Sequence, residues 1–152
     1  MKYIEGDLIQ LAMNGEFDAI THGCNCFCQM GKGIALTIKR KFPEAYIADC
    51  ETQKGNKNKL GTCTIAKSQN SKGDELRIIN AYTQFDWRGR GLKANYDAIR
   101  SCMQWINTNF PNTRLGLPKI GAGLANGDWN VIERILEEEL TDLEPTVVIY
   151  RA

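Results

Sequence analysis

The chain has 152 residues, of which 43% are hydrophobic and 24% are charged. This composition is typical of a globular protein with one sizeable core, and it excludes disordered, collagen-like and low-complexity chains. Lysine and arginine together number 19, and aspartate and glutamate 18, so the formal net charge is +1. Such a balance gives no general attraction to nucleic acids or to anionic membranes.

No apolar run reaches the roughly 20 residues of a membrane-spanning helix, and Lys2, Glu5 and Asp7 stand where a signal peptide would be apolar. We therefore expect a cytoplasmic protein with no membrane partner. The six cysteines are expected to be reduced thiols, because a chain of this length builds a core without disulfides.

The N-terminal part of the chain predicts two strands and two helices. Residues 3–5 and 17–22 suit strands, and Asp7 suits the N-cap of a short helix between them. Apolar residues spaced by four positions then predict an amphipathic helix that starts near Ile34 and ends or kinks at Pro43.

The rest of the chain predicts a hairpin followed by further helices and strands. Residues 62–66 and 76–82 suit two strands joined by a polar turn. Apolar positions within residues 96–106 predict a long helix that stops before Pro111. A strand, a helix and a strand are predicted at residues 115–117, 129–140 and 146–150. This alternation predicts an α/β protein, a three-layer α/β/α domain with a mixed central sheet.

Two glycine-containing loops leave predicted strands and lead into predicted helices. The first covers residues 23–35 and the second residues 118–129. Glycine lets the backbone approach a ligand closely, and unpaired amides at a helix start favour an anion. Because ligands of such sheets bind at the carboxyl ends of the strands, the two loops together predict a diphosphate site.

The loops fit neither of the best-known nucleotide motifs. The second loop reads G-x-G-x-x-x-G, one residue off the dinucleotide fingerprint, and Gly31-Lys32-Gly33 is followed by Ile34 rather than by the residues of a P-loop. We therefore expect neither a Rossmann domain nor a magnesium-bound triphosphate, and no cofactor.

Four short motifs occur in a fixed order along the whole chain. They are Gly6-Asp7-Leu8, His22-Gly23-Cys24-Asn25, Met30-Gly31-Lys32-Gly33-Ile34-Ala35 and Pro118-Lys119-Ile120-Gly121-Ala122-Gly123-Leu124. In this order and spacing they resemble the macro domain, a module that binds ADP-ribose. The resemblance covers residues 1–152 and is greatest to the branch of terminal ADP-ribose protein glycohydrolases, macro-domain antitoxins and ADP-ribose 1″-phosphate phosphatases.

The resemblance implies ligand-binding roles for particular residues. Asp7 would accept a hydrogen bond from the adenine amino group while the Leu8 amide reads the ring, and Asn25 would contact the distal ribose. Asp7 also suits a helix N-cap, and Asn25 also suits a loop residue that bonds its own backbone. The other expected ligand-binding residues are Gly31, Lys32, Gly33, Ile34, Ala35, Thr83, Gln84, Gly121, Ala122, Gly123, Leu124 and Ala125.

Two positions depart from the glycohydrolase pattern. Those relatives carry a lysine after the threonine that ends the strand at residues 76–82, where it attacks the ribose carbon, whereas here Gln84 follows Thr83. They also carry an aspartate where this chain has Ala125. Covalent removal of ADP-ribose by a lysine is therefore not expected.

His22, Asn25 and Asp128 are the candidate catalytic residues for water attack on ADP-ribose 1″-phosphate. His22 is the single histidine, and an ordinary imidazole pKa of about 6.5 suits proton transfer near neutral pH. The alternative is a hydrogen-bonded structural histidine. Asp128 closes the second loop, and its alternative is the N-cap of the next helix.

Two further segments carry chemistry-bearing residues. Cys24, Cys26 and Cys28 lack a second cysteine pair at zinc spacing, so we expect small buried thiols and no metal, with a Cys24 nucleophile beside His22 as the alternative. Residues 85–93 are aromatic and basic. Near-neutral overall charge favours a solvated or ligand-flanking loop over a contact with single-stranded nucleic acid.

The sequence therefore predicts a monomer that binds ADP-ribose and hydrolyses ADP-ribose 1″-phosphate to ADP-ribose and phosphate. The alternatives are a non-catalytic reader of ADP-ribose and a hydrolase that removes it from modified macromolecules, such as an ADP-ribosylated protein.

Overall fold

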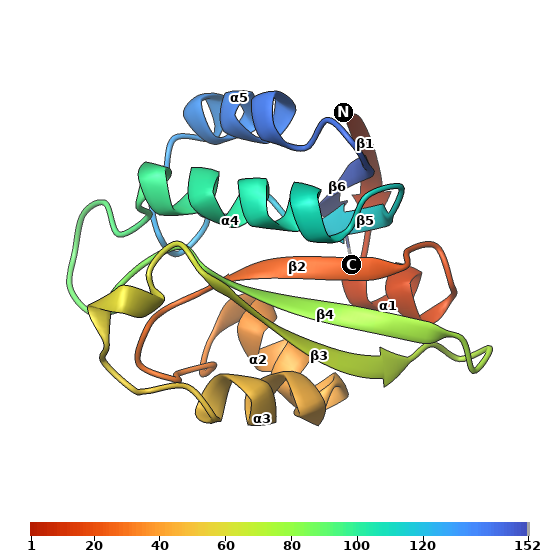
Figure 1. Cartoon of the computed structure of the whole chain (residues 1–152), viewed down its shortest axis with the longest axis horizontal. Helices are drawn as coiled ribbons and strands as arrows, with labels where there is room; N and C mark the ends of the chain where they lie inside the picture. The colour runs from red at the N-terminus through yellow and green to blue at the C-terminus, as the bar shows by residue number, and fades with distance from the viewer. Residues whose placement is uncertain (152) are drawn as a thin grey trace.

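The computed structural model describes residues 1–151, and its centre is one six-stranded sheet with the order β1-β6-β5-β2-β4-β3 (Figure 1). The strands are β1 (Lys2–Gly6), β2 (Ala19–Cys24), β3 (Cys63–Gln69), β4 (Glu75–Tyr82), β5 (Arg114–Leu117) and β6 (Glu144–Tyr150). Every pairing is parallel except that of β3 with β4. The sheet is therefore mixed, and the predicted hairpin is confirmed.

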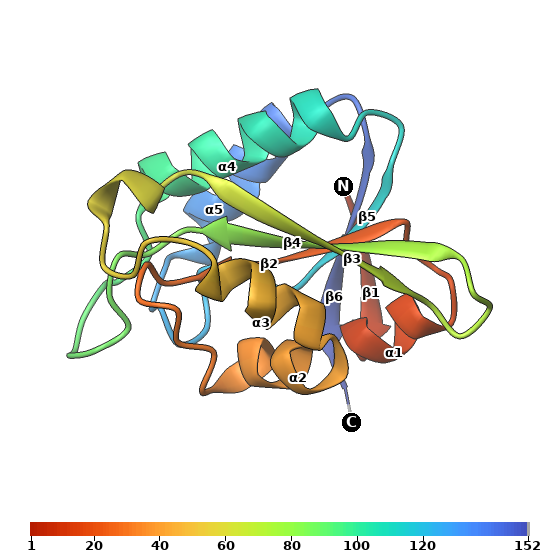
Figure 2. The ribbon, with the colours of Figure 1, turned by 60° about the horizontal axis from the view of Figure 1, so that its bottom comes forward.

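Helices cover both faces of this sheet, which confirms the predicted three-layer α/β/α class (Figures 1 and 2). They are α1 (Leu8–Met13), α2 (Gly33–Lys41), α3 (Pro43–Cys50), α4 (Tyr96–Asn109) and α5 (Trp129–Glu139), with a short 3₁₀ helix, η1 (Lys57–Lys59). α4 and α5 cover one face, and α1, α2 and α3 the other. Among the described helices, none is long and apolar enough to cross a bilayer.

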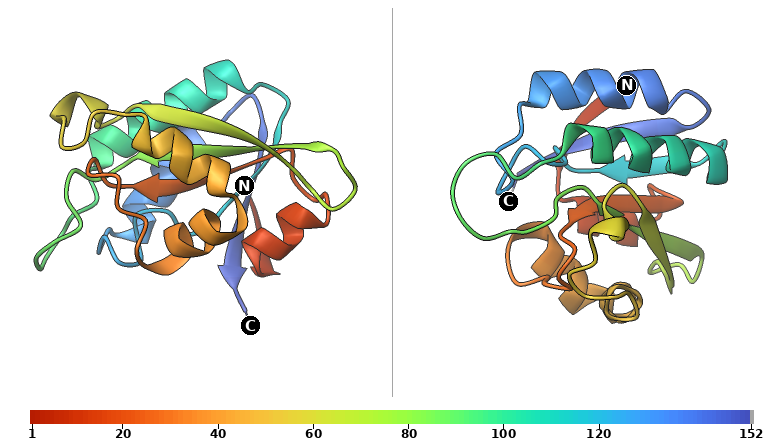
Figure 3. Two further views of the ribbon diagram at one scale, coloured as in Figure 1. Left: turned by 90° about the horizontal axis from the view of Figure 1, so that it is seen from below. Right: turned by 60° about the vertical axis from the view of Figure 1, so that its left-hand side comes forward.

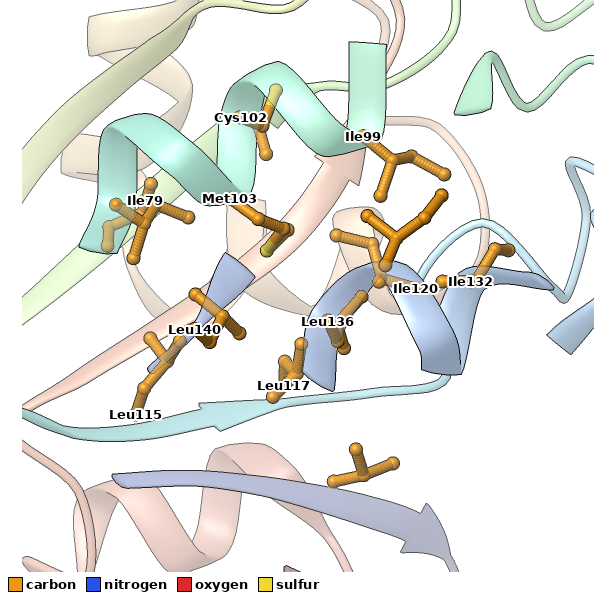
Figure 4. Packing of buried hydrophobic residues seen from close by; sticks show 14 of the residues in the cluster. Ile79, Ile99, Cys102, Met103, Leu115, Leu117, Ile120, Ile132, Leu136 and Leu140 are labelled. Carbon is orange, nitrogen blue, oxygen red and sulfur yellow. The ribbon is translucent and has the colours of Figure 1, made fainter. Parts of the chain in front are cut away.

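A hydrophobic layer fills the space between the sheet and each set of helices. Met103 of α4 and Leu136 of α5 pack with Leu115 of β5 on one face (Figure 4). On the other face, Ile20 of β2 packs with Ile38 of α2. Neighbouring residues of one strand face opposite layers, so the packing fixes which side chains of β2 point toward which helices.

Most predicted elements differ from the structure by a few residues at their ends, and two differences change the interpretation. The strand predicted at 17–22 runs from Ala19 to Cys24, because its register with β4 pairs these two residues with Arg77 and Tyr82. Pro43 does end the first amphipathic helix, but it also begins α3, which the periodicity did not predict. Proline suits this first helical position because it has no N–H to leave unpaired.

The carboxyl ends of the parallel strands place three segments at one edge of the sheet. Residues 25–32 follow β2, residues 83–95 follow β4, and residues 118–128 follow β5. The segment between β4 and α4 extends outward from this edge (Figures 1 and 3). Both glycine-containing loops therefore leave the edge at which ligands of such sheets bind.

Candidate functional site

A cavity of about 730 Å³ opens where β2, β4 and β5 end, a volume that suits a small-molecule ligand. Its wall comes from the three segments at this edge. The wall includes twelve of the expected ligand-binding residues, namely Asn25, Gly31, Lys32, Gly33, Ile34, Ala35, Thr83, Gln84, Gly121, Gly123, Leu124 and Ala125. The fold therefore brings most of the expected residues together.

The two glycine-containing loops touch each other across this cavity. A Cβ built on Gly33 would lie 3.3 Å from Leu124 Cδ1, so the first loop passes directly beside the second. Gly33 has a φ of +59°, a conformation that favours glycine. Within the second loop, a Cβ on Gly127 would lie 2.4 Å from the carbonyl oxygen of Gly121. Side chains at these positions would disturb the shape of both loops.

The N-terminus of α2 offers open backbone amides to the cavity. Lys32 occupies the N-cap position, and in the described chain no side chain caps this helix. The first-turn residues Gly33, Ile34 and Ala35 all line the cavity. Unpaired amides at a helix start, together with the helix dipole, favour a bound anion. α2 therefore supplies the anion-binding geometry that the sequence predicted.

The charged residues of the cavity wall are all cationic. Lys32, Arg88, Lys93 and Lys119 line it, and among the described residues no aspartate or glutamate does. This bias is local, because the net charge of the whole chain is only +1. A wall with four cations and no carboxylate suits a ligand that carries several negative charges.

His22 does not line the cavity, although sequence analysis expected it beside the ligand. Its side chain is fully buried, with Nε2 2.7 Å from Asn80 Oδ1. Burial lowers the pKa of His22 to about 4, and the hydrogen bond with Asn80 opposes this shift. The imidazole is therefore neutral at neutral pH and remote from solvent. The structure supports the alternative of a structural histidine.

Asp128 also has a structural role. It is the N-cap of α5, and its carboxylate accepts a hydrogen bond of 2.9 Å from the backbone N–H of Asn130. It lies outside the cavity wall, so the geometry favours the N-cap over the catalytic interpretation.

Three other expected ligand-binding residues also lie outside the wall. Asp7 caps α1 by accepting a hydrogen bond from Gln10 N. Leu8 is buried in the hydrophobic cluster on one face of the sheet, and Ala122 packs against the cluster on the other face. Asp7 and Leu8 do follow β1 on the same edge of the sheet. Their contact with adenine therefore stays a prediction.

Asn25 lines the cavity and at the same time orders its own loop. Its Nδ2 donates to Gln29 O at 2.8 Å, and its Oδ1 accepts from Phe27 N at 2.9 Å. These bonds match the loop-residue alternative and fix the backbone that leads from β2 toward α2. A contact with the distal ribose stays a prediction for this residue.

The buried thiols near the cavity are poor nucleophiles. Cys24 lines the cavity 3.6 Å from His22 Nε2, but burial raises the pKa of its thiol well above the ordinary value. Burial likewise raises the pKa of Cys26 to about 11, although nearby Lys59 opposes this shift. Since the thiolate is the reactive form, a Cys24 nucleophile is disfavoured. Residues 1–151 hold no cluster of three or more metal-ligating side chains.

The aromatic and basic segment after β4 flanks the cavity. Trp87, Arg88, Gly89 and Lys93 line the wall. Phe27 lies edge-on to both Phe85 and Trp87, with ring centroids 5.0 and 6.0 Å away. Arg88 pairs with Asp86 and lies over the Trp87 ring. The segment therefore flanks the cavity, and its contact with a ligand stays a prediction.

Comparisons with known proteins agree with this architecture. Residues 21–136 match the family model described as Macro domain. A 17.5 kDa protein of Enterobacteria phage T4, described as uncharacterized, is 35% identical over 97% of this chain and 95% of its own length. An ADP-ribose 1″-phosphate phosphatase of Debaryomyces hansenii is 28% identical over 91% of this chain and 93% of its own.

A third relative is much longer than this chain. The DNA ADP-ribosyl glycohydrolase of Mycobacterium tuberculosis is 27% identical over 95% of this chain, which spans only 41% of that protein. The solved macrodomain of Mycobacterium tuberculosis DarG superimposes with a TM-score of 0.68 at 26% identity, over 99% of this chain and 97% of that one.

Proposed function

Because the chain belongs to the macro domain family, we propose that its cavity binds ADP-ribose and that it hydrolyses ADP-ribose 1″-phosphate to ADP-ribose and phosphate. The pyrophosphate would lie between residues 31–35 and residues 121–125, against the open amides of α2. Asp7 would bind the adenine at the end of β1.

The charge of the cavity wall is the observation that carries this proposal. Lys32, Arg88, Lys93 and Lys119 face a space that no described carboxylate lines. ADP-ribose already brings a diphosphate, and the 1″-phosphate adds a third phosphoryl group. Cations and backbone amides bind such a ligand and stabilise the charge that develops on the transferred phosphoryl group.

The proposed reaction uses water directly. The water oxygen bonds to phosphorus, the bond between phosphorus and the 1″ oxygen breaks, and the sugar oxygen takes up the proton that the water loses. Neither His22 nor Asp128 reaches the cavity, so catalysis would rest on positioning and electrostatic stabilisation rather than on either side chain.

One relative and one residue bear on the choice between a phosphatase and a glycohydrolase. The Debaryomyces hansenii relative, named an ADP-ribose 1″-phosphate phosphatase, matches nearly its full length. Gln84 lines the cavity at the position where the glycohydrolase pattern has its lysine, and an amide does not attack a sugar carbon. Relatives of both kinds match most of this chain, so the missing lysine is what favours reaction at the phosphate rather than at the ribose.

The loop after β4 favours a second candidate function, removal of ADP-ribose from nucleic acid. Trp87 and Arg88 stand at the cavity wall, and an aromatic ring beside a cation suits a base and its phosphate. The Mycobacterium tuberculosis relative is named a DNA ADP-ribosyl glycohydrolase. This chain matches only 41% of that relative, so we rank this function second.

A paired assay separates these functions. One assay measures phosphate release from ADP-ribose 1″-phosphate. A second measures ADP-ribose release from ADP-ribosylated single-stranded DNA and from a protein that carries ester-linked ADP-ribose. Calorimetric titration measures binding of free ADP-ribose. We expect binding and phosphate release. Binding without turnover of any substrate would identify a reader. Release of ADP-ribose from DNA alone would favour the second candidate, and release from the modified protein alone would identify a hydrolase of ADP-ribosylated protein. Absence of binding would contradict the proposal altogether.

A further inference from the structure

Lys59 is a buried lysine that lies behind the first glycine-containing loop. The residue is 7% exposed, whereas Lys57, the other lysine of η1, is exposed. The ion pairs of residues 1–151 do not include Lys59. Lysine is seldom buried without a carboxylate partner, because removing its charge from water is costly. The other partners of this ammonium therefore indicate what it does.

The ammonium of Lys59 binds the loop between β2 and α2. Its Nζ donates to the carbonyl oxygen of Cys26 at 3.2 Å and lies 3.7 Å from Cys28 Sγ. The carbonyl oxygen of Cys26 also accepts from the N–H of Gly55 at 2.7 Å. Lys59 Nζ lies 4.7 Å from the centre of the Tyr82 ring, at the end of β4. None of these residues lines the cavity, so Lys59 holds the loop from outside it.

Cys28 has a backbone conformation that needs support from its surroundings. Its φ is +57°, in the left-handed region where residues other than glycine are uncommon. Such conformations persist where neighbouring groups hold them. The Cys28 thiol donates to the carbonyl oxygen of Asp49 at 3.2 Å, and its sulfur is in contact with Lys59. These two contacts hold the turn through which the chain passes from β2 toward α2.

The anion-binding amides follow this turn directly. The first-turn residues Gly33, Ile34 and Ala35 line the cavity a few positions after Cys28. Their direction depends on how the preceding backbone is held. Without the ammonium of Lys59, the Cys28 turn would lose one of the contacts that hold it. We therefore expect the start of α2 to be less well ordered without this lysine.

A buried carboxyl group belongs to the same surroundings. Asp49 Oδ1 accepts a hydrogen bond of 2.8 Å from the Tyr82 hydroxyl. Burial raises the pKa of Asp49, and the Tyr82 hydroxyl and the Lys59 ammonium oppose this shift. Removal of Lys59 alone would leave this carboxyl without an opposing cation, which is destabilising. A fair test therefore also removes the charge of Asp49.

We propose that Lys59 is a positioning residue of the diphosphate site, because its ammonium holds the turn at residues 26–28 and this turn directs the amides at the start of α2. The inference rests on the proposed function, since it takes the diphosphate of ADP-ribose as the group that these amides bind. The diphosphate keeps its charge throughout reaction at the 1″-phosphate. Loss of Lys59 should therefore raise KM and leave kcat nearly unchanged.

The test compares Lys59→Met with the wild type, and the double variant Asp49→Asn, Lys59→Met with Asp49→Asn. In both pairs we expect the ADP-ribose affinity, measured by calorimetry, to fall about tenfold. The hydrogen-bonded amides of Cys26 and Phe27 should exchange faster with solvent in the free protein. KM for ADP-ribose 1″-phosphate should rise about tenfold, with kcat within about twofold. Calorimetry and amide exchange need no turnover, so they also test a chain that only binds.

Two variants control for charge and for stability. Lys54→Met removes an exposed lysine from the same segment between α3 and β3. Ile106→Val loosens the core beneath α4, and Ile106 does not line the cavity. Neither should change the affinity by more than about twofold.

Three results would overturn the inference. They are an unchanged affinity in the folded double variant relative to Asp49→Asn, a lower affinity with unchanged exchange of the Cys26 and Phe27 amides, and an equal loss of affinity in Ile106→Val. A wild-type chain that does not bind ADP-ribose would instead contradict the proposed function.

Discussion

Burial of a neutral imidazole makes the stability of this fold sensitive to acid. His22 has a pKa of about 4 in the folded chain, against about 6.5 for an exposed histidine. Between these values the unfolded chain binds more protons, so stability falls as the pH falls. The contribution lost between pH 7 and pH 4 is about 3 kcal/mol. Urea unfolding at both pH values measures the total change, and comparison with a variant that lacks this imidazole isolates the His22 part.

His22→Gln keeps an amide donor for Asn80 and cannot become charged. We expect this variant to lose about 3 kcal/mol less stability than the wild type over the same pH range. It should also retain phosphate release at pH 7, because His22 does not line the cavity. Identical pH profiles for the two proteins would contradict the buried neutral state, and loss of turnover with intact folding would restore a catalytic role.

A side chain at Gly33 should block the cavity. Gly33→Val adds a branched side chain 3.3 Å from Leu124 Cδ1 at a φ of +59°, so we expect ADP-ribose affinity to fall about tenfold or more. Gly73→Val is the matched control. Gly73 has a φ of +83° in the turn between β3 and β4, with nothing within 4 Å of its built Cβ.

Both variants strain the backbone, but only one intrudes on the site. Calorimetric titration should therefore show normal ADP-ribose binding for Gly73→Val, with both variants less stable in thermal unfolding. Equal affinities for the two variants would show that the loop at Gly33 does not contact the ligand.

The sequence could not reveal which residues near the strand ends face the ligand. The predicted strand 17–22 makes His22 its last residue, next to a loop. The observed strand continues to Cys24, so His22 lies within the sheet and pairs in register with Asn80. A shift of two residues in the strand end thus separates a candidate catalytic histidine from a buried structural one.

Among the elements, α2 and α5 both begin at the edge of the sheet where the cavity opens, but their N-termini are capped differently. Asp128 caps α5, whereas Lys32 provides no side-chain cap for α2. We expect Asp128→Ala to reduce stability by about 1 kcal/mol through loss of the cap, with unchanged phosphate release. Chemical unfolding measures the change in stability, and a turnover assay measures phosphate release. A loss of turnover larger than the loss of folded protein would contradict the structural role.

Element types could be predicted well from the sequence, because periodicity and capping residues are local signals. The strands at 76–82 and 115–117, the helix over 96–106 and the cap at Asp7 all appear in the structure. α3 could not be predicted, since Pro43 signals the end of one helix and the start of another in the same way.

At the scale of the whole molecule, the cavity joins segments that lie far apart in the sequence. Glycine spacing and the family resemblance indicated residues 31–35 and 121–125, and the fold brings both to one edge. The sequence could not predict that the cavity wall is cationic, because Arg88 and Lys93 lie on an irregular loop. The net charge of +1 for the whole chain also does not show where positive charges gather. The position of Trp87 depends on its contact with Phe27, which a sequence does not show.

The position of bound ADP-ribose in a crystal structure tests the central claim most directly. We predict that the pyrophosphate lies between residues 31–35 and residues 121–125, with the adenine toward Asp7. Electron density for the ligand at another surface, or an empty cavity at ligand concentrations that saturate binding in solution, would contradict it.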